Sequence, residues 1–368
     1  MADELSPLGS EIRRLIGVAG PMPVAEYMRL CLTHPQHGYY IKREPIGASG
    51  DFVTSPEISQ MFGELIGLWM AGVWHQMGAP ENVRVIELGP GRGTLMQDAL
   101  RAVQVARKFH AAIVLHLVEI SPALRHLQQQ RLQGLDLPVN WHGAFDEVPD
   151  GPCIVIANEF LDALPIHQAI KRRGGWYERV IEVSADGNLV FGLDYDPLPR
   201  FEATLPSELR QSPDGSIFEW RSDAFALEVG RRVRQGGAAL ILDYGHAHCA
   251  IGDTLQAVSG HAYTDPLRAS GEVDLTAHVD FEALARSAEA IGARIHGPIQ
   301  QRDLLFRLGI GKRAEALKAH ASRDKVLEIE LALSRLTATG PRGMGELFKA
   351  LAITDTKLGP PPGFGTSP

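Results

Sequence analysis

The sequence contains little cysteine. Its 368 residues include three, Cys31, Cys153 and Cys249, which lie far apart and form no C-x-x-C pair. This spacing argues against a disulfide framework and against a thiolate zinc site. Two histidines in residues 34–40 have no third ligand beside them, so the sequence predicts no metal site.

The sequence also lacks a long apolar run and an excess of positive charge. Its most apolar stretch, residues 58–77, contains Glu64, His75 and two glutamines, so we expect no membrane span. Lysine and arginine number 36 against 44 acidic residues, which argues against a general nucleic-acid binder. Near residue 1 no apolar segment resembles a secretory signal, and the acidic residues there argue against a transit peptide. We therefore expect a cytoplasmic protein.

Strands alternate with helices from residue 83 onward. The predicted strands are short and apolar, and cover 83–88, 113–118, 138–142, 153–157, 238–242, 294–299 and 347–353. Alternation of this kind indicates a parallel sheet, and wholly apolar strands indicate burial on both faces. The sequence therefore predicts an α/β fold.

Other segments depart from this alternation. Glycine-containing turns between β-rich runs predict an antiparallel insertion. A segment rich in Gly, His and Asp, residues 246–275, predicts a long functional loop. The expected division is a helical region packing on the core (1–80), a core (81–165 and 221–358), an inserted β module on the substrate side (166–220) and a disordered tail (359–368). Within the first region, Ser55 is expected to cap a long helix in which Pro56 is the first residue.

A glycine-rich turn follows the first predicted strand. Residues 87–94 read ELGPGRGT, which places Gly89, Gly91 and Gly93 in a G-x-G-x-G pattern. Glycines there let a cofactor approach the backbone closely. A dinucleotide fingerprint, G-x-G-x-x-G, needs its third glycine where this chain has Thr94. The spacing favours the first motif of S-adenosylmethionine (SAM) methyltransferases, with a plain glycine turn as the alternative.

Carboxylates stand where such a cofactor would need them. Glu119 ends the second strand and can accept hydrogen bonds from both ribose hydroxyls, although NAD-binding proteins use the same device. Glu87 can hold the ammonium group of SAM, while N–H groups at the helix start, near Thr94, can take its carboxylate. We therefore expect SAM as the cofactor.

The fourth strand ends in a polar segment. Residues 158–165 read NEFLDALP, so Asn158, Glu159 and Asp162 follow an apolar strand. Carboxyl ends of strands face the ligand crevice in open α/β sheets, which makes this segment a candidate reacting site. The alternative for Asp162 is the cap of a following helix.

Motifs spread along the whole chain resemble the MidA family of SAM-dependent methyltransferases, which includes a mitochondrial complex I assembly-factor methyltransferase. The matching stretches, in order, are residues 34–40, 50–64 (GDFVTSPEISQMFGE), 87–95, 158–165, 243–245, 271–281 and 344–345. The resemblance implies a class I, Rossmann-like methyltransferase fold. It also implies methylation of an arginine on the large, quinone-site-proximal subunit of respiratory complex I.

Residue roles follow from this reading. Because a guanidinium stays protonated, flanking carboxylates are needed to orient it and stabilise its charge. The expected roles are catalytic for Glu159, Asp162 and Asp51; cofactor binding for Glu87, Gly89, Gly91, Gly93, Thr94, Glu119, Asn158, Thr54 and Ser55; and lining of the substrate channel for Asp243, Tyr244 and His278. For His278, a buried structural role is the alternative. Two other functions stay open, a small-molecule methyltransferase and a SAM-binding assembly chaperone.

Overall fold

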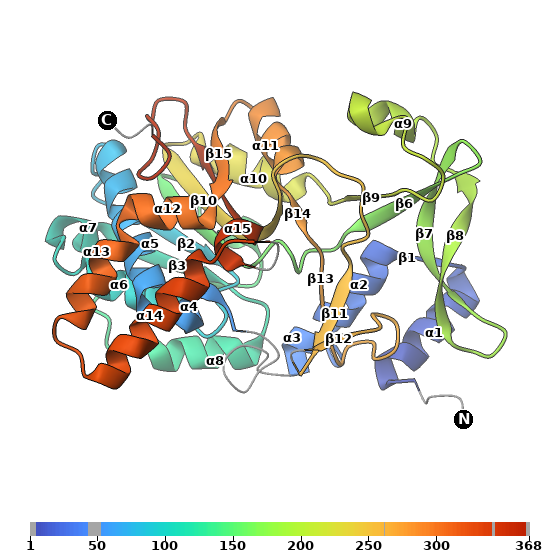
Figure 1. Ribbon diagram of the computed structural model, residues 1–368, viewed down its shortest axis with the longest axis horizontal. Helices are drawn as coiled ribbons and strands as arrows, with labels where there is room; N and C mark the ends of the chain where they lie inside the picture. The colour runs from blue at the N-terminus through green and yellow to red at the C-terminus, as the bar shows by residue number, and fades with distance from the viewer. Residues whose placement is uncertain (1–4, 43–52, 261, 341–342, 366–368) are drawn as a thin grey trace.

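The computed structural model describes residues 5–42, 53–260, 262–340 and 343–365. These residues form two lobes, a larger one built on a mixed sheet and a smaller one to its right in Figure 1. The first described helix, α1 (Pro7–Ala19), lies in the small lobe.

The large lobe contains the main sheet. In spatial order its strands are β15 (Arg294–Gln300), β16 (Phe348–Thr354), β10 (Gly237–His246), β5 (Cys153–Asn158), β2 (Val83–Leu88), β3 (Ile113–Val118) and β4 (Val139–His142), with β14 (Val279–Asp280) paired to the end of β10. Strands β4, β3, β2, β5 and β10 are parallel, whereas β16 is antiparallel to both of its neighbours. The expected α/β fold is confirmed.

Helices cover both faces of this sheet. The helices of the large lobe are α4 (Ser55–Ile58), α5 (Gln60–Gln76), α6 (Thr94–Val103), α7 (Arg107–Ala112), α8 (Pro122–Arg131), α10 (Ala224–Val233), α11 (Phe281–Ala290), α12 (Gln301–Leu308), α13 (Ile310–Lys318), α14 (Arg323–Thr337) and α15 (Met344–Leu347). Side chains alternate along each strand, so Val85 faces the core beneath α5 and α6, and Ile86 faces the core beneath α10 and α11. Burial of each large apolar side chain stabilises these layers by about 1.5–3 kcal/mol.

The small lobe holds two further sheets. Its five-stranded sheet contains β1 (Met22–Pro23), β7 (Gly175–Val183), β6 (His167–Arg172), β9 (Ile217–Trp220) and β8 (Leu189–Pro197). A three-stranded sheet contains β12 (Ala262–Thr264), β11 (Gln256–Ser259) and β13 (Asp274–Thr276). Its helices are α1 (Pro7–Ala19), α2 (Val24–Thr33), α3 (Tyr39–Lys42) and α9 (Phe201–Thr204).

The N-terminal region differs from its expected place. Helices α1–α3 pack on the small lobe, because β1 pairs with β7 and a shared apolar cluster joins Tyr27 of α2 to Ile181 of β7. The expected packing of residues 1–80 on the core holds only for α4 and α5. Ser55 is also not a cap, since Thr54 occupies that position and Ser59, in extended conformation, caps a separate helix.

Two other expectations are wrong. Residues 246–275, expected to form a long functional loop, contain strands, because β11 pairs with β13 and both bury side chains, Ala257 and Leu275, in the small lobe. Residues 359–365 are ordered, since Phe364 packs on the large core and Gln76 Nε2 donates to the Pro360 carbonyl at 3.1 Å. Apolar burial there outweighs the flexibility that a Pro/Gly-rich composition suggests.

Among the residues whose placement is described, none of the helices combines the length and apolarity needed to cross a bilayer. Within the same part of the chain, no three His, Cys, Asp or Glu side chains gather as metal ligands.

Candidate active site

The candidate site lies where the chain reverses its direction across the main sheet. From β2 the chain continues through β3 to β4 on one side, and then returns to place β5 on the other side of β2. Ligands of open α/β sheets bind at such a switch point, outside the carboxyl ends of the strands. The predicted glycine turn follows β2 at this point (Figure 1).

The glycine turn is held in a conformation that requires glycine. Gly89, Gly91 and Gly93 all have positive φ, +61°, +53° and +78°. A Cβ atom at Gly89 would lie 2.7 Å from Cδ2 of Phe160, so any side chain there would clash. The backbone is thereby left bare beside Thr94, where α6 starts and its first N–H groups have no helical partners.

Glu87 lies at the buried end of β2, beneath the turn. The residue is 3% exposed, and its Oε2 atom has no hydrogen-bond partner among the described residues. Burial raises the pKa of the Glu87 carboxyl group to about 8, with a smaller contribution from the charge of Glu119. Oδ1 of Asn158, at the end of the neighbouring strand β5, also has no hydrogen-bond partner among the described residues. A cationic ligand group would satisfy these acceptors.

Glu119 directly follows β3, on the other side of the turn. Its Oε1 accepts the Ser121 N–H at 2.9 Å, and its Oε2 accepts from Nε2 of Gln128 at 3.3 Å. Burial raises the pKa of the Glu119 carboxyl group to about 7. Gln128 Nε2 also donates to the Gly91 carbonyl at 2.8 Å, so a single side chain links the glycine turn to the acid.

Glu159 follows β5 in a strained conformation. Its φ is +49°, a region that costs a non-glycine residue about 1–3 kcal/mol and that clusters at functional sites. Its Oε1 accepts the Ser55 N–H at 2.7 Å and Nδ2 of Asn158 at 3.1 Å. Desolvation raises the pKa of Glu159 to about 7 even though part of the residue reaches solvent.

Asp243 does not line a channel, and this expectation is wrong. The residue is fully buried, and its Oδ2 accepts the N–H groups of Phe160, Leu161 and Asp162 at 2.8–3.2 Å. Its Oδ1 accepts the N–H of Tyr244 at 2.9 Å. Asp243 therefore holds the segment after β5 in place from β10.

Asp162, which is buried, and Tyr244, which is partly exposed, form a pair behind that segment. No helix follows Asp162, so it does not cap one; its Oδ1 accepts the Ala163 N–H at 2.9 Å within a turn. Burial raises the pKa of Asp162, and a hydrogen bond with the Tyr244 hydroxyl opposes the rise. The Tyr244 ring meets His278 edge to face at 5.6 Å, and burial lowers the pKa of that histidine.

The remaining predicted residues are spread around the turn. Thr94 hydrogen-bonds through its hydroxyl to Glu57 and Arg131, which ties the start of α6 to α4. Thr54 precedes α4 and accepts the Glu57 N–H through its carbonyl at 2.9 Å. Asp51 lies outside the described residues.

Sequence reasoning missed two residues that organise the site. Gln128 gives no signal beyond its place on an amphipathic helix after Glu119. Arg221 donates to the carbonyls of Leu164, Ala277 and His278 at 2.7–3.2 Å, and so joins three segments behind the site. Its position at the end of the inserted module, next to Trp220, was the only hint in the sequence.

The residues present fit a SAM molecule. An unpartnered buried carboxylate oxygen at Glu87 suits its ammonium group, a strand-end acid at Glu119 suits its ribose, and the bare turn admits both. In agreement with this, residues 65–299 match the model of a family of S-adenosyl-L-methionine-dependent methyltransferases. The chain belongs to that family and is a SAM-dependent methyltransferase.

Individual proteins and one solved structure are also similar to this chain. The chain is 40% identical to the mitochondrial protein arginine methyltransferase NDUFAF7 homolog of Drosophila melanogaster, over 94% of this chain and 84% of that protein. It is 35% identical to human mitochondrial protein arginine methyltransferase NDUFAF7, over 95% and 83%. A Burkholderia thailandensis COG1565 superfamily member, solved with S-adenosyl-homocysteine bound, superposes with a TM-score of 0.85 at 28% identity and covers 98% of this chain and 95% of that one.

Proposed function

We propose that this methyltransferase transfers the methyl group of SAM to an arginine side chain of a protein. The names of its relatives supply the acceptor class, since both the fly and the human protein are protein arginine methyltransferases. The observation that carries the proposal in this chain is Glu159, a strained acid at the carboxyl edge of the sheet.

Glu159 is suited to a cationic acceptor. One of its oxygens accepts from Ser55 and Asn158, and the pKa near 7 leaves a large fraction of the group ionised at neutral pH. A guanidinium group brought beside it would donate to the carboxylate and be oriented by it. Its positive charge would also lower the pKa of Glu159 and keep the group ionised.

The reaction then needs one methyl group and one proton to move. Bound SAM would supply a methyl group attached to a positively charged sulfur. When the N–C bond forms, the S–C bond breaks and the sulfur is left as a neutral thioether. Glu159 orients the guanidinium nitrogen and accepts the proton that this nitrogen loses. Asp162 acts from behind, because its carboxyl group accepts the Ala163 N–H and bonds to the Tyr244 hydroxyl, which fixes the segment that carries Glu159. Asp51 stays a third candidate from the sequence.

The remaining cofactor contacts are proposed residue by residue. Glu87 and Asn158 hold the amino acid end of SAM, the turn around Gly91 approaches it closely, and Glu119 takes the ribose. Thr54, Ser55 and Thr94 stand at helix starts beside the same space. Tyr244 and His278 are proposed to line the acceptor's approach.

The resemblance to the MidA family suggests the acceptor protein. We propose the large, quinone-site-proximal subunit of respiratory complex I, methylated in the bacterial cytoplasm in support of its assembly. The alternatives are methylation of a small molecule and an assembly role with little catalysis.

The decisive experiment combines a gene deletion with reconstitution. Extract from the deletion strain is incubated with purified protein and SAM carrying a labelled methyl group, and labelled residues are identified by mass spectrometry. We expect methylarginine on one complex I subunit, missing in the deletion strain and restored by the protein. Glu159→Gln should slow the transfer at least a hundredfold, whereas Glu315→Gln, on the exposed face of α13, should not change it.

Other outcomes would reject parts of the proposal. Label found only in the small-molecule fraction would replace the protein acceptor with a metabolite. Arginine that remains methylated in the deletion strain would exclude the complex I subunit as the target.

A further inference from the structure

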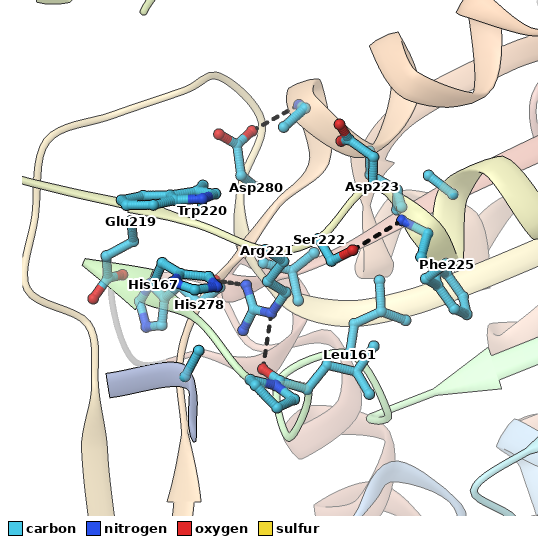
Figure 2. Close-up of a pocket in the computed structure, with 18 of the residues that line it drawn as sticks. Leu161, His167, Glu219, Trp220, Arg221, Ser222, Asp223, Phe225, His278 and Asp280 are labelled. Atoms are coloured by element: carbon cyan, nitrogen blue, oxygen red, sulfur yellow. Dashed lines mark hydrogen bonds between the residues drawn. The ribbon is translucent and has the colours of Figure 1, made fainter. Parts of the chain in front are cut away.

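A large cleft separates the two lobes beside the candidate site. It encloses about 1030 Å³ between β6 and β9 of the small lobe and the starts of α10 and α11 (Figure 2). Small-molecule pockets usually measure roughly 300–1,000 Å³. The cleft is therefore large enough for a segment of polypeptide, and none of the cofactor contacts proposed above lines it.

Phe160 connects the cleft to the cofactor side of the sheet. It follows Glu159 directly, lines the cleft, and packs on Phe225 of α10 with ring centres 5.9 Å apart. Its other edge is the group that a Cβ at Gly89 would strike. A chain lying in the cleft would contact the residue that directly follows Glu159 in the sequence.

Aromatic rings form the wall on the small-lobe side. Trp220 stacks on His167 with ring centres 5.1 Å apart and an angle of 14°, and its other neighbour, Phe201, lies 4.9 Å away. Trp220 remains partly exposed in the cleft, where Figure 2 shows it above His167 and His278. The exposed part of the indole offers an aromatic surface against which the long side chain of an arginine can pack.

The charge of the lining is acidic. Five acids line the cleft against two arginines, the acids being Asp146, Glu219, Asp223, Glu228 and Asp280. Glu228 is paired with two arginines of α10, and Arg221 is bonded to backbone carbonyls, so neither faces a ligand freely. Asp223 and Asp146 are exposed, and Asp280 is partly exposed and caps α11. These three carboxylates, with the exposed Arg286 of α11 beside them, leave a net negative charge on the large-lobe side, opposite Trp220.

We propose that the cleft binds a basic, arginine-containing segment of the acceptor protein, and that it positions the residues flanking the methylated arginine. The segment lies between the indole of Trp220 and the carboxylates of Asp223 and Asp280. This assignment rests on the proposed function, because it names the substrate class of the same reaction. An acidic segment would be repelled by these carboxylates, and a wholly apolar segment would bring them no opposite charge.

Peptide binding tests the cleft without any need for catalysis. The probe is a fluorescein-labelled peptide of sequence GFRGLRGFRG, with GFEGLEGFEG as its acidic counterpart, and the measurement is fluorescence anisotropy on the full chain. We expect the arginine peptide to bind and the acidic peptide not to bind. Trp220→Ala and Asp223→Lys should each weaken binding about tenfold. Asp186→Lys, the same change on an exposed turn of the small lobe, should leave binding unchanged.

The outcomes separate this proposal from the proposed function. SAM affinity measured by calorimetry should be the same in the wild type, Trp220→Ala and Asp223→Lys, which shows that the variants are folded. Equal peptide affinity in wild type and Asp223→Lys, or preference for the acidic peptide, would overturn the cleft assignment. If transfer to the protein acceptor also proceeded at an unchanged KM in that variant, the proposed function would stand alone. If the arginine peptide bound in the cleft but no methylarginine were formed, the cleft assignment would stand and the proposed function would fail.

Discussion

At the scale of single residues, the site brings several acids together in a poorly solvated place. Burial raises the pKa of Glu87 to about 8 and those of Glu119 and Glu159 to about 7. Each group is therefore partly protonated near neutral pH. A ligand that carries positive charge favours the ionised forms, so ligand binding and proton release are linked.

This linkage predicts the pH dependence of SAM binding. The folded protein holds a proton on Glu87 below about pH 8, and that proton must leave before the carboxylate can pair with the ammonium group. SAM affinity should consequently rise from pH 6 to pH 8, by up to about tenfold per pH unit for each proton released. Calorimetry in buffers of different ionisation enthalpy measures the protons directly.

Glu87→Gln should bind SAM about tenfold more weakly and lose one released proton. Glu289→Gln, an exposed acid on α11, should keep the wild-type profile. A Glu87→Gln protein that still releases the same number of protons would contradict this placement of the charge.

The glycine turn supplies a second prediction. Gly89→Ala should reduce both SAM affinity and the free energy of unfolding, because the new Cβ lies 2.7 Å from Phe160 at a φ of +61°. We expect a loss of about 1–3 kcal/mol in stability. Gly174→Ala has a similar φ, +77°, but an open surrounding, so it should show only the smaller cost of backbone strain. Chemical denaturation compares the two, and equal losses would contradict the close contact.

Part of the site could be read from the sequence. The positions of Glu87, Glu119 and Glu159 follow from strand ends, which are local features. The role of Asp243 could not be predicted, because its carboxylate meets N–H groups more than 80 residues earlier in the chain. Gln128 was missed for the same reason, since its importance comes from the carbonyl of Gly91.

At the scale of elements, buried strands were predictable and lobe membership was not. Strand β2 has the bounds that its apolar run predicts, since burial on both faces leaves a continuous signal. Strand β1 is only two residues long, and its sequence contains no pattern that predicts pairing with β7. Extended backbone at Ser59 likewise interrupts an apolar pattern that predicted one unbroken helix.

Helices α5 and α6 pack closely through glycines. A Cβ atom at Gly67 would lie 2.6 Å from the carbonyl oxygen of Ala99, and one at Gly63 would lie 2.7 Å from Cβ of Asp98. Because these glycines have no Cβ atom, the backbones of the two helices lie closer together than any other residue would allow.

Gly67→Ala should therefore destabilise the protein by about 1–3 kcal/mol, although alanine is the better helix former. Gly17→Ala, on the exposed side of α1 with no atom within 4 Å, should stabilise it by about 0.5–1 kcal/mol. Unfolding in urea gives both values. If both changes stabilised the protein, α5 and α6 would have to be able to move apart and accommodate the added methyl group.

At the scale of the whole molecule, Arg221 joins the lobes. Its guanidinium follows β9 of the small lobe and donates to carbonyls in the segment after β5 and in the segment between β13 and β14. These carbonyls would lose their partners if the guanidinium were removed.

Arg221→Met should lower the free energy of unfolding by about 3 kcal/mol, because buried carbonyls would be left without donors. Arg231→Met removes ion pairs that lie on the surface of α10, and should cost about 1 kcal/mol or less. Chemical denaturation of both variants measures their free energies of unfolding. Equal losses in the two variants would argue against Arg221 as the link between the lobes.

The small lobe has a further consequence for the synthesis of the protein. Tyr27 of α2 hydrogen-bonds through its hydroxyl to Pro266 and Ser270, and the Ser6 hydroxyl donates to the carbonyl of Ser270. At a translation rate of roughly 5–20 residues per second, α2 waits about 12–50 s on the ribosome before these partners are made. During that interval the part of its apolar face that meets Leu275 and Ala277 in the folded protein lacks these partners, whereas Ile181 of β7 is made earlier, so the core of the small lobe is completed only late in synthesis.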